Sequence, residues 1–165
     1  MNIFTQTLAT ELCQYYRNLA IGHNVVPKVF SMVNADGDQY LFFTEDLGLD
    51  EDQESNFLNA ILEDHDAICY GKGTLVVTED EQHYVEIAVI DKEDPMGIWC
   101  SAALTVDGDG NPVDLSDFEQ TVVGRTKLYF SRLFDDHPMD KDLRAGYLAA
   151  WTEIKTHILH REMLV

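Results

Sequence analysis

Glu153, His157 and His160, near the C-terminus, have side chains and spacings that could hold a divalent metal ion. Intervals of four and three residues place all three on one flank of a helix, and carboxylate and imidazole groups are ligands of zinc. A metal site also needs a further ligand, and no other residue has a spacing that marks it as one. Since the apolar stripe of this helix is centred away from His160, we interpret the flank as a solvated helix face and expect no metal.

The segment Asp107-Gly108-Asp109-Gly110-Asn111 begins like a calcium-binding loop, with oxygen ligands at alternate positions. The pattern then fails, because Pro112 stands where the loop needs glycine and Phe118 stands where the closing glutamate belongs, one residue before Glu119. A tight glycine-rich turn accounts for the same residues. The sequence therefore predicts a turn here and no calcium site.

Gly71-Lys72-Gly73-Thr74 has the ending of a phosphate-binding loop, but Asp66 stands where the earlier glycine is required. Apolar residues continue after this segment as a strand, whereas a phosphate loop must open a helix. We predict that these glycines mark a bulge or a close approach of two backbones. His65 and His137 fall at expected helix boundaries, and we assign them no acid-base role.

The three cysteines, Cys13, Cys69 and Cys100, form an odd number without a Cys-x-x-Cys pair or a histidine at zinc spacing. They indicate neither a disulfide framework nor a zinc knuckle. Cys69 and Cys100 fall in apolar strand-like runs, so we expect both thiols to be buried and reduced.

The chain start lacks the basic lead of a signal peptide, and no stretch of about 18 apolar residues could span a bilayer. We therefore expect a cytoplasmic protein without cofactors.

The spacing of apolar residues predicts the elements that position these side chains. Helical spacing over residues 4–19 predicts a first helix. Two runs rich in β-branched and aromatic residues, 25–34 and 39–44, flank Asp36-Gly37 and predict a hairpin with an exposed turn. Asp50, with a glutamine three positions on, starts a second helix that ends near residue 65.

The second half of the chain changes period. Residues 67–78, 84–90 and 98–106 predict three strands. Ser116 with Glu119 has the form of a capping box, which predicts a third helix to about residue 133, and a final helix follows Pro138 to about residue 158.

These elements give the order α-ββ-α-βββ-α-α in a single globular domain, residues 1–165. We predict an α+β fold with one antiparallel sheet of about five strands and helices packed against it. The order of the first seven elements resembles that of roadblock and profilin-type modules and, less closely, that of secretion chaperones. The resemblance is topological and implies an α+β fold, and no functional residue is carried over from it.

Charge limits the classes of partner. Thirty acidic residues against eleven basic ones give a net charge of -19, which disfavours direct binding to nucleic acid or to an anionic membrane. Residues 1–119 hold 24 acids and four bases, whereas residues 120–165 hold six acids and seven bases. The acidic part is either a solvated face or a surface that recruits a basic protein.

No catalytic residue can be named, and the motifs of nucleophile elbows, zinc proteases and dinucleotide folds do not occur. Our leading hypothesis is a non-enzymatic cytoplasmic protein that binds another protein. The charge makes a basic protein the possible partner. One alternative is an acidic DNA mimic from a phage or mobile element that inhibits a host DNA-binding protein, and another is a small enzyme of unrecognised type. The apolar residues of the terminal helices also predict a homodimer.

Overall fold

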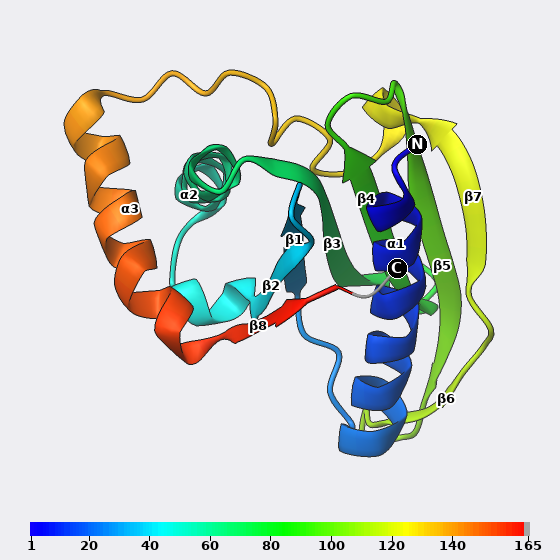
Figure 1. Ribbon diagram of the computed structural model, residues 1–165. Helices are drawn as coiled ribbons and strands as arrows, with labels where there is room; N and C mark the ends of the chain where they lie inside the picture. The colour runs from blue at the N-terminus through cyan, green and yellow to red at the C-terminus, as the bar shows by residue number, and fades with distance from the viewer. Residues whose placement is uncertain (164–165) are drawn as a thin grey trace.

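The computed structural model describes residues 1–163 and has an α+β fold with one antiparallel sheet, as predicted (Figure 1). The sheet has eight strands in the order β6-β5-β4-β3-β1-β2-β8, with β7 also pairing with β5. The expectation of about five strands is therefore wrong, because three further strands extend the sheet at its edges. The strands are β1 (Val29–Asn34), β2 (Asp38–Phe43), β3 (Ala67–Val77), β4 (His83–Asp91), β5 (Met96–Val106), β6 (Pro112–Leu115), β7 (Glu119–Gly124) and β8 (Leu159–Glu162).

Helix α1 (Ile3–Arg17) lies on the concave side of the curled sheet, against β3, β4 and β5 (Figure 1). The helix approaches β3 closely because Gly71 and Gly73 have no side chains. A Cβ at these glycines would lie 2.4 Å from Leu12 Cδ1 and 2.3 Å from Tyr16 Cε2, respectively. The glycines therefore mark a close approach, which was one of the two roles predicted for them.

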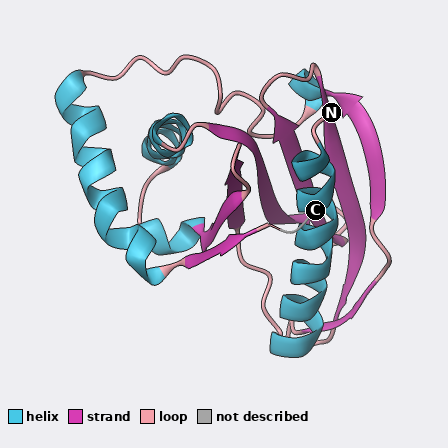
Figure 2. Ribbon diagram, viewed as in Figure 1, coloured by secondary structure: helices cyan, strands magenta, loops and turns pink. Residues whose placement is uncertain are grey.

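Helices α2 (Glu51–Asp64) and α3 (Lys141–Ile154) lie on the opposite, convex side and pack against each other (Figure 2). Asp50 and Gln53 form the predicted capping box at the start of α2. Trp151 is the one buried residue of α3 and packs in the core beneath α2.

Within residues 1–163, no helix is long and apolar enough to cross a membrane. Short helical turns cover Asn18–Gly22, Thr44–Leu47, Arg125–Lys127 and Lys155–His157.

The turn between β1 and β2 contains Asp36 and Gly37, as predicted, and Gly37 adopts a φ of 85°. Asp36 is exposed, but Gly37 is buried beside the Phe4 ring and the Met163 backbone. The prediction of an exposed turn is therefore wrong at Gly37, because the curled sheet folds the hairpin tip over the start of α1.

The third helix predicted from Ser116 and Glu119 is wrong. Ser116 Oγ accepts a hydrogen bond from the Ala103 N–H (2.8 Å), and Glu119 begins β7, which pairs with β5. The β-branched run Thr121-Val122-Val123 favours this extended pairing. Residues 125–134, the remainder of the predicted helix, cross the convex face mostly as loop and turns (Figure 2).

The final helix is shorter than predicted, because α3 ends at Ile154 and not near residue 158. The chain then forms a single helical turn and β8, which pairs with β2 and sets His160 opposite Tyr40. A four-residue strand has too short a pattern to be recognised locally, and the exposed edge of β2 decides its conformation.

Candidate functional site

Residues 125–134, which we call the strap, lead from β7 across the convex face towards α3 (Figure 1). Arg125 Nη1 donates hydrogen bonds to the carbonyl oxygens of Asp91 (3.2 Å) and Lys92 (3.1 Å). Its Nη2 lies 3.6 Å from Asp135 Oδ1. One guanidinium group therefore ties the start of the strap, and Asp135 directly after its end, to the end of β4.

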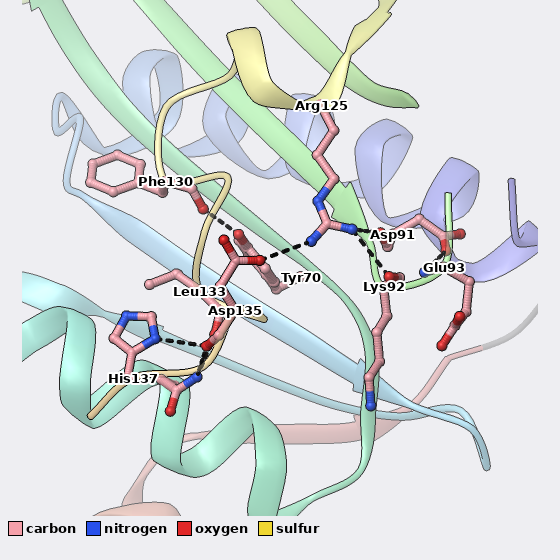
Figure 3. Close-up of polar contacts among 10 residues, drawn as sticks. Tyr70, Asp91, Lys92, Glu93, Arg125, Phe130, Leu133, Asp135 and His137 are labelled. Atoms are coloured by element: carbon pink, nitrogen blue, oxygen red, sulfur yellow. Dashed lines mark hydrogen bonds and ion pairs between the residues drawn. The ribbon is translucent and has the colours of Figure 1, made fainter. Parts of the chain in front are cut away.

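Asn59 of α2 fixes the end of the strap. Its Nδ2 donates hydrogen bonds to the carbonyl oxygens of Leu133 (2.8 Å) and Asp135 (2.9 Å). His137 Nδ1 lies 2.8 Å from the same Asp135 oxygen (Figure 3). The expected position of His137 at a helix boundary is wrong, since the N-cap of α3 is Asp140.

Lys72 of β3 lies beneath the strap with its ammonium group between a carboxylate and an aromatic ring. Its Nζ is 2.5 Å from Glu54 Oε2 and 3.4 Å from the centre of the Phe130 ring. The Lys72 side chain is 3% exposed, and that of Glu54 is 17% exposed. Burial lowers the pKa of Lys72, and the ion pair with Glu54 opposes this effect. The ammonium group is thus already engaged by a carboxylate of the chain.

Phe130 has a φ of 58°, in the left-handed region that bulky side chains rarely adopt. Two contacts hold it there. Its ring covers Lys72, and its carbonyl oxygen accepts a hydrogen bond from the Tyr70 hydroxyl, which Figure 3 shows. Tyr70 is buried, and burial raises its pKa, so the phenol keeps the proton that it donates. Lys72 and Tyr70, on the convex face of β3, therefore fix the strap over the sheet.

A cleft of about 330 Å³ lies where the strap leaves β7, and we call it the aromatic cleft. Its lining comes from the convex face of β4, β5 and β7 and from the strap: Glu86, Trp99, Val123, Lys127, Leu128 and Tyr129. Burial raises the pKa of Glu86, and no hydrogen bond or cation in the described chain offsets this effect. The cleft thus combines two aromatic side chains with one carboxylate that forms no ion pair with the Lys127 ammonium group at the same cleft.

Sequence reasoning missed the aromatic cleft. Glu86 is the single charged residue in the otherwise apolar run from Val85 to Ile90, and that isolated charge was the one local signal. Trp99 and Tyr129 gave no signal, because their positions beside Glu86 depend on strand pairing and on the path of the strap.

The predicted flank of Glu153, His157 and His160 does not exist as one helix face. Glu153 lies in the last turn of α3, His157 in the following helical turn and His160 in β8. His160 instead stacks on the Tyr40 ring at 4.3 Å. Within residues 1–163, no group of three or more His, Cys, Asp and Glu side chains is placed to hold a metal ion.

His65 lies at the C-cap of α2, as predicted, and connects this helix to α3. Its Nε2 accepts a hydrogen bond from Trp151 Nε1 (2.6 Å), which requires this nitrogen to carry no proton. Burial is the main cause that lowers the pKa of His65, and Lys155 and His160 lower it further. His65 therefore acts as a neutral acceptor between two helices.

The Asp107 segment forms the tight turn that was predicted, between β5 and β6. Asp107 Oδ1 accepts hydrogen bonds from the backbone amides of Asp109 and Asn111, each at 2.9 Å.

Cys69 and Cys100 are buried, as predicted, and burial raises the pKa of Cys69 to about 12.

No protein-family model, curated protein or solved structure matches this chain. The resemblance in element order to roadblock and profilin-type modules therefore carries no functional argument, and the function has to be argued from the site.

Proposed function

We propose that this protein acts by binding a partner protein, and that the aromatic cleft receives a cationic side chain of that partner. The observation that supports this is Glu86, a half-buried carboxylate that shares a cleft with Trp99 and Tyr129 and is in no ion pair within residues 1–163. Aromatic faces and a carboxylate together attract a cation. Arginine suits them better than lysine, because its planar guanidinium stacks on a ring while it donates two hydrogen bonds to a carboxylate.

The charge of the whole chain supports a basic partner. A net charge of -19 attracts a basic protein and speeds its encounter. The loop before α2 and its first turn hold five exposed acids, and none of them is in an ion pair within residues 1–163: Glu45, Asp46, Asp50, Glu51 and Asp52. These carboxylates would attract the partner, whereas the aromatic cleft would select its side chain.

Lys127 lines the same cleft but does not pair with Glu86. An ammonium group at this position repels an incoming cation, so it lowers the affinity of the cleft for that cation.

We further propose a non-enzymatic role in the cytoplasm. The three free thiols support this compartment, because the cytoplasm keeps thiols reduced.

The test is a titration with a short arginine-glycine peptide at about 0.15 M salt, followed by calorimetry and by the fluorescence of Trp99. Glu86→Gln removes the only carboxylate of the cleft, and we expect the affinity to fall about tenfold, the effect of losing one charged hydrogen-bonded pair. Lys127→Gln should raise the affinity. A lysine-glycine peptide should bind more weakly than the arginine peptide.

The matched control is Glu79→Gln, which makes the same chemical change at an exposed residue of the turn between β3 and β4. Salt and solvent screen this charge, so we expect its affinity to stay within about twofold of the unchanged protein. Equal losses in Glu86→Gln and Glu79→Gln would mean that the peptide responds only to net charge, and the proposal would be wrong.

A further inference from the structure

β7 is an outer strand whose free edge differs from those of the other outer strands. Within residues 1–163 it pairs with β5 alone, and no strand lies beyond it (Figure 1). Natural proteins protect such edges with proline and charge. β6 carries Pro112 and Asp114, and β8 carries three ionisable side chains at 160–162, whereas β7 has one charge in six residues and Val122 is 60% exposed. The edge of β7 is therefore unprotected.

The hydrogen-bond pattern tells which amides of β7 are free. The Arg125 N–H donates to the Pro95 carbonyl (2.9 Å), and β7 continues from this pair in antiparallel register with β5. Because bonded and non-bonded pairs alternate in such a ladder, the amide of Thr121 points to β5, and those of Gln120 and Val122 point away from the sheet. Gln120 and Val122 thus offer backbone donors and acceptors to a further strand.

Each face of β7 offers a different environment to the side chains of such a strand. On the concave side, β7 and α1 border a groove of about 490 Å³ that exposes Met96, Ile98 and Val122 beside the uncharged polar side chains of Gln6, Thr10, Gln120 and Thr121, and its one carboxylate, Asp94, is paired with the Met1 amino group. On the convex side lie Glu119 and the aromatic cleft, which begins at Val123 of β7 and has Trp99 one strand further in, on β5. One side of the edge therefore suits apolar side chains and the other suits cations.

We infer that the partner binds as an extended segment that adds to the free edge of β7, with alternate residues apolar and basic. This inference rests on the proposed function and specifies the partner's chemistry. Side chains of a strand alternate between its two faces, so apolar residues face the groove and basic residues face Glu119 and the aromatic cleft. Trp99 lies two strand spacings, about 10 Å, from the added backbone, and an extended arginine spans most of this distance.

A second copy of the chain suits this edge poorly. β7 carries Glu119 and no basic side chain, so two copies paired through β7 would leave both carboxylates without a cation. Charge complementarity therefore favours a basic segment of another protein.

The probe for the test is a synthetic peptide of alternating arginine and valine. In the unchanged protein, peptide binding should slow the hydrogen exchange of the Gln120 and Val122 amides. Val122→Pro removes one outward N–H and keeps the bonds to β5, and we expect the affinity to fall about tenfold. Val122→Thr keeps the N–H and the β-branched shape, and its affinity should stay within about threefold.

Unchanged exchange rates at Gln120 and Val122 in the peptide complex would overturn the inference, and this readout holds even if Val122→Pro fails to fold. Equal affinities of Val122→Pro and Val122→Thr would overturn it as well. If Glu86→Gln weakens binding while these amides stay unprotected, strand addition is wrong and the cation site stands. A species of twice the 18.8 kDa chain mass that Val122→Pro abolishes would assign the edge to self-association and overturn the choice of partner.

Discussion

The ion pair beneath the strap predicts an asymmetric effect of mutation. Glu54→Gln leaves the Lys72 ammonium group, whose side chain is 3% exposed, without a counter-charge. Removing one partner of a buried pair costs about 3 to 5 kcal/mol, and the 17% exposure of Glu54 places this case near 3 kcal/mol. Lys72→Met removes the buried charge and keeps an apolar stem under Phe130, while the partly exposed Glu54 regains water. We expect its cost to be about 1 kcal/mol.

Urea denaturation followed by tryptophan fluorescence measures both costs. With a slope of about 2 kcal/mol per M, Glu54→Gln should lower the midpoint by about 1.5 M and Lys72→Met by about 0.5 M. The double variant should resemble Lys72→Met, because neither residue of the pair then carries a charge. A Lys72→Met variant as unstable as Glu54→Gln would contradict this expectation, because it would mean that the attraction between the two groups, and not the burial of the ammonium group, dominates.

Three further predictions concern the core, the helix contact and the oligomeric state. Gly73→Ala puts a Cβ 2.3 Å from a buried tyrosine ring and should destabilise the fold by about 2 to 4 kcal/mol in urea denaturation. The control Gly124→Ala has open space around the added Cβ and should change the free energy of unfolding by less than about 0.5 kcal/mol. Because the pKa of His65 is lower in the folded state, the unfolded state binds the proton first as pH falls below 6.5. The melting temperature should therefore fall as pH falls below 6.5, and in His65→Gln it should depend less on pH. The predicted homodimer through the terminal helices is not tested by the structure, and α3, where Leu143 is 42% exposed, offers a surface for it. Sedimentation equilibrium should give twice the 18.8 kDa chain mass, and Leu143→Glu should reduce the measured mass to that of one chain.

The first seven elements were predictable because their signals are local and agree with one another. The capping box at Asp50, the Asp-Gly turn and the alternation in β5 each specify one conformation. The error after Ser116 arose where two patterns compete: helical spacing of apolar residues and a β-branched run at residues 121–123. The free edge of β5, which is invisible in the sequence, decides between them.

The candidate site depends on contacts between distant residues. Lys72 lies 18 positions from Glu54, and Tyr70 lies 60 positions from Phe130. The sequence singled out Lys72 for its glycine neighbours, and the structure explains those glycines by the approach of α1 on the opposite face of the sheet. The DNA-mimic and enzyme alternatives stay predictions, since neither is tested by the fold.

Chemical-shift mapping of the complex with the arginine-glycine peptide shows whether the peptide enters the aromatic cleft. We expect the largest shifts at the Trp99 indole N–H and at the Glu86 and Tyr129 amides, and in Glu86→Gln the same peaks should move only at about tenfold higher peptide concentration. Shifts confined to the exposed acids at residues 45–52 would contradict the account, because they would show that the peptide responds to surface charge and does not enter the aromatic cleft.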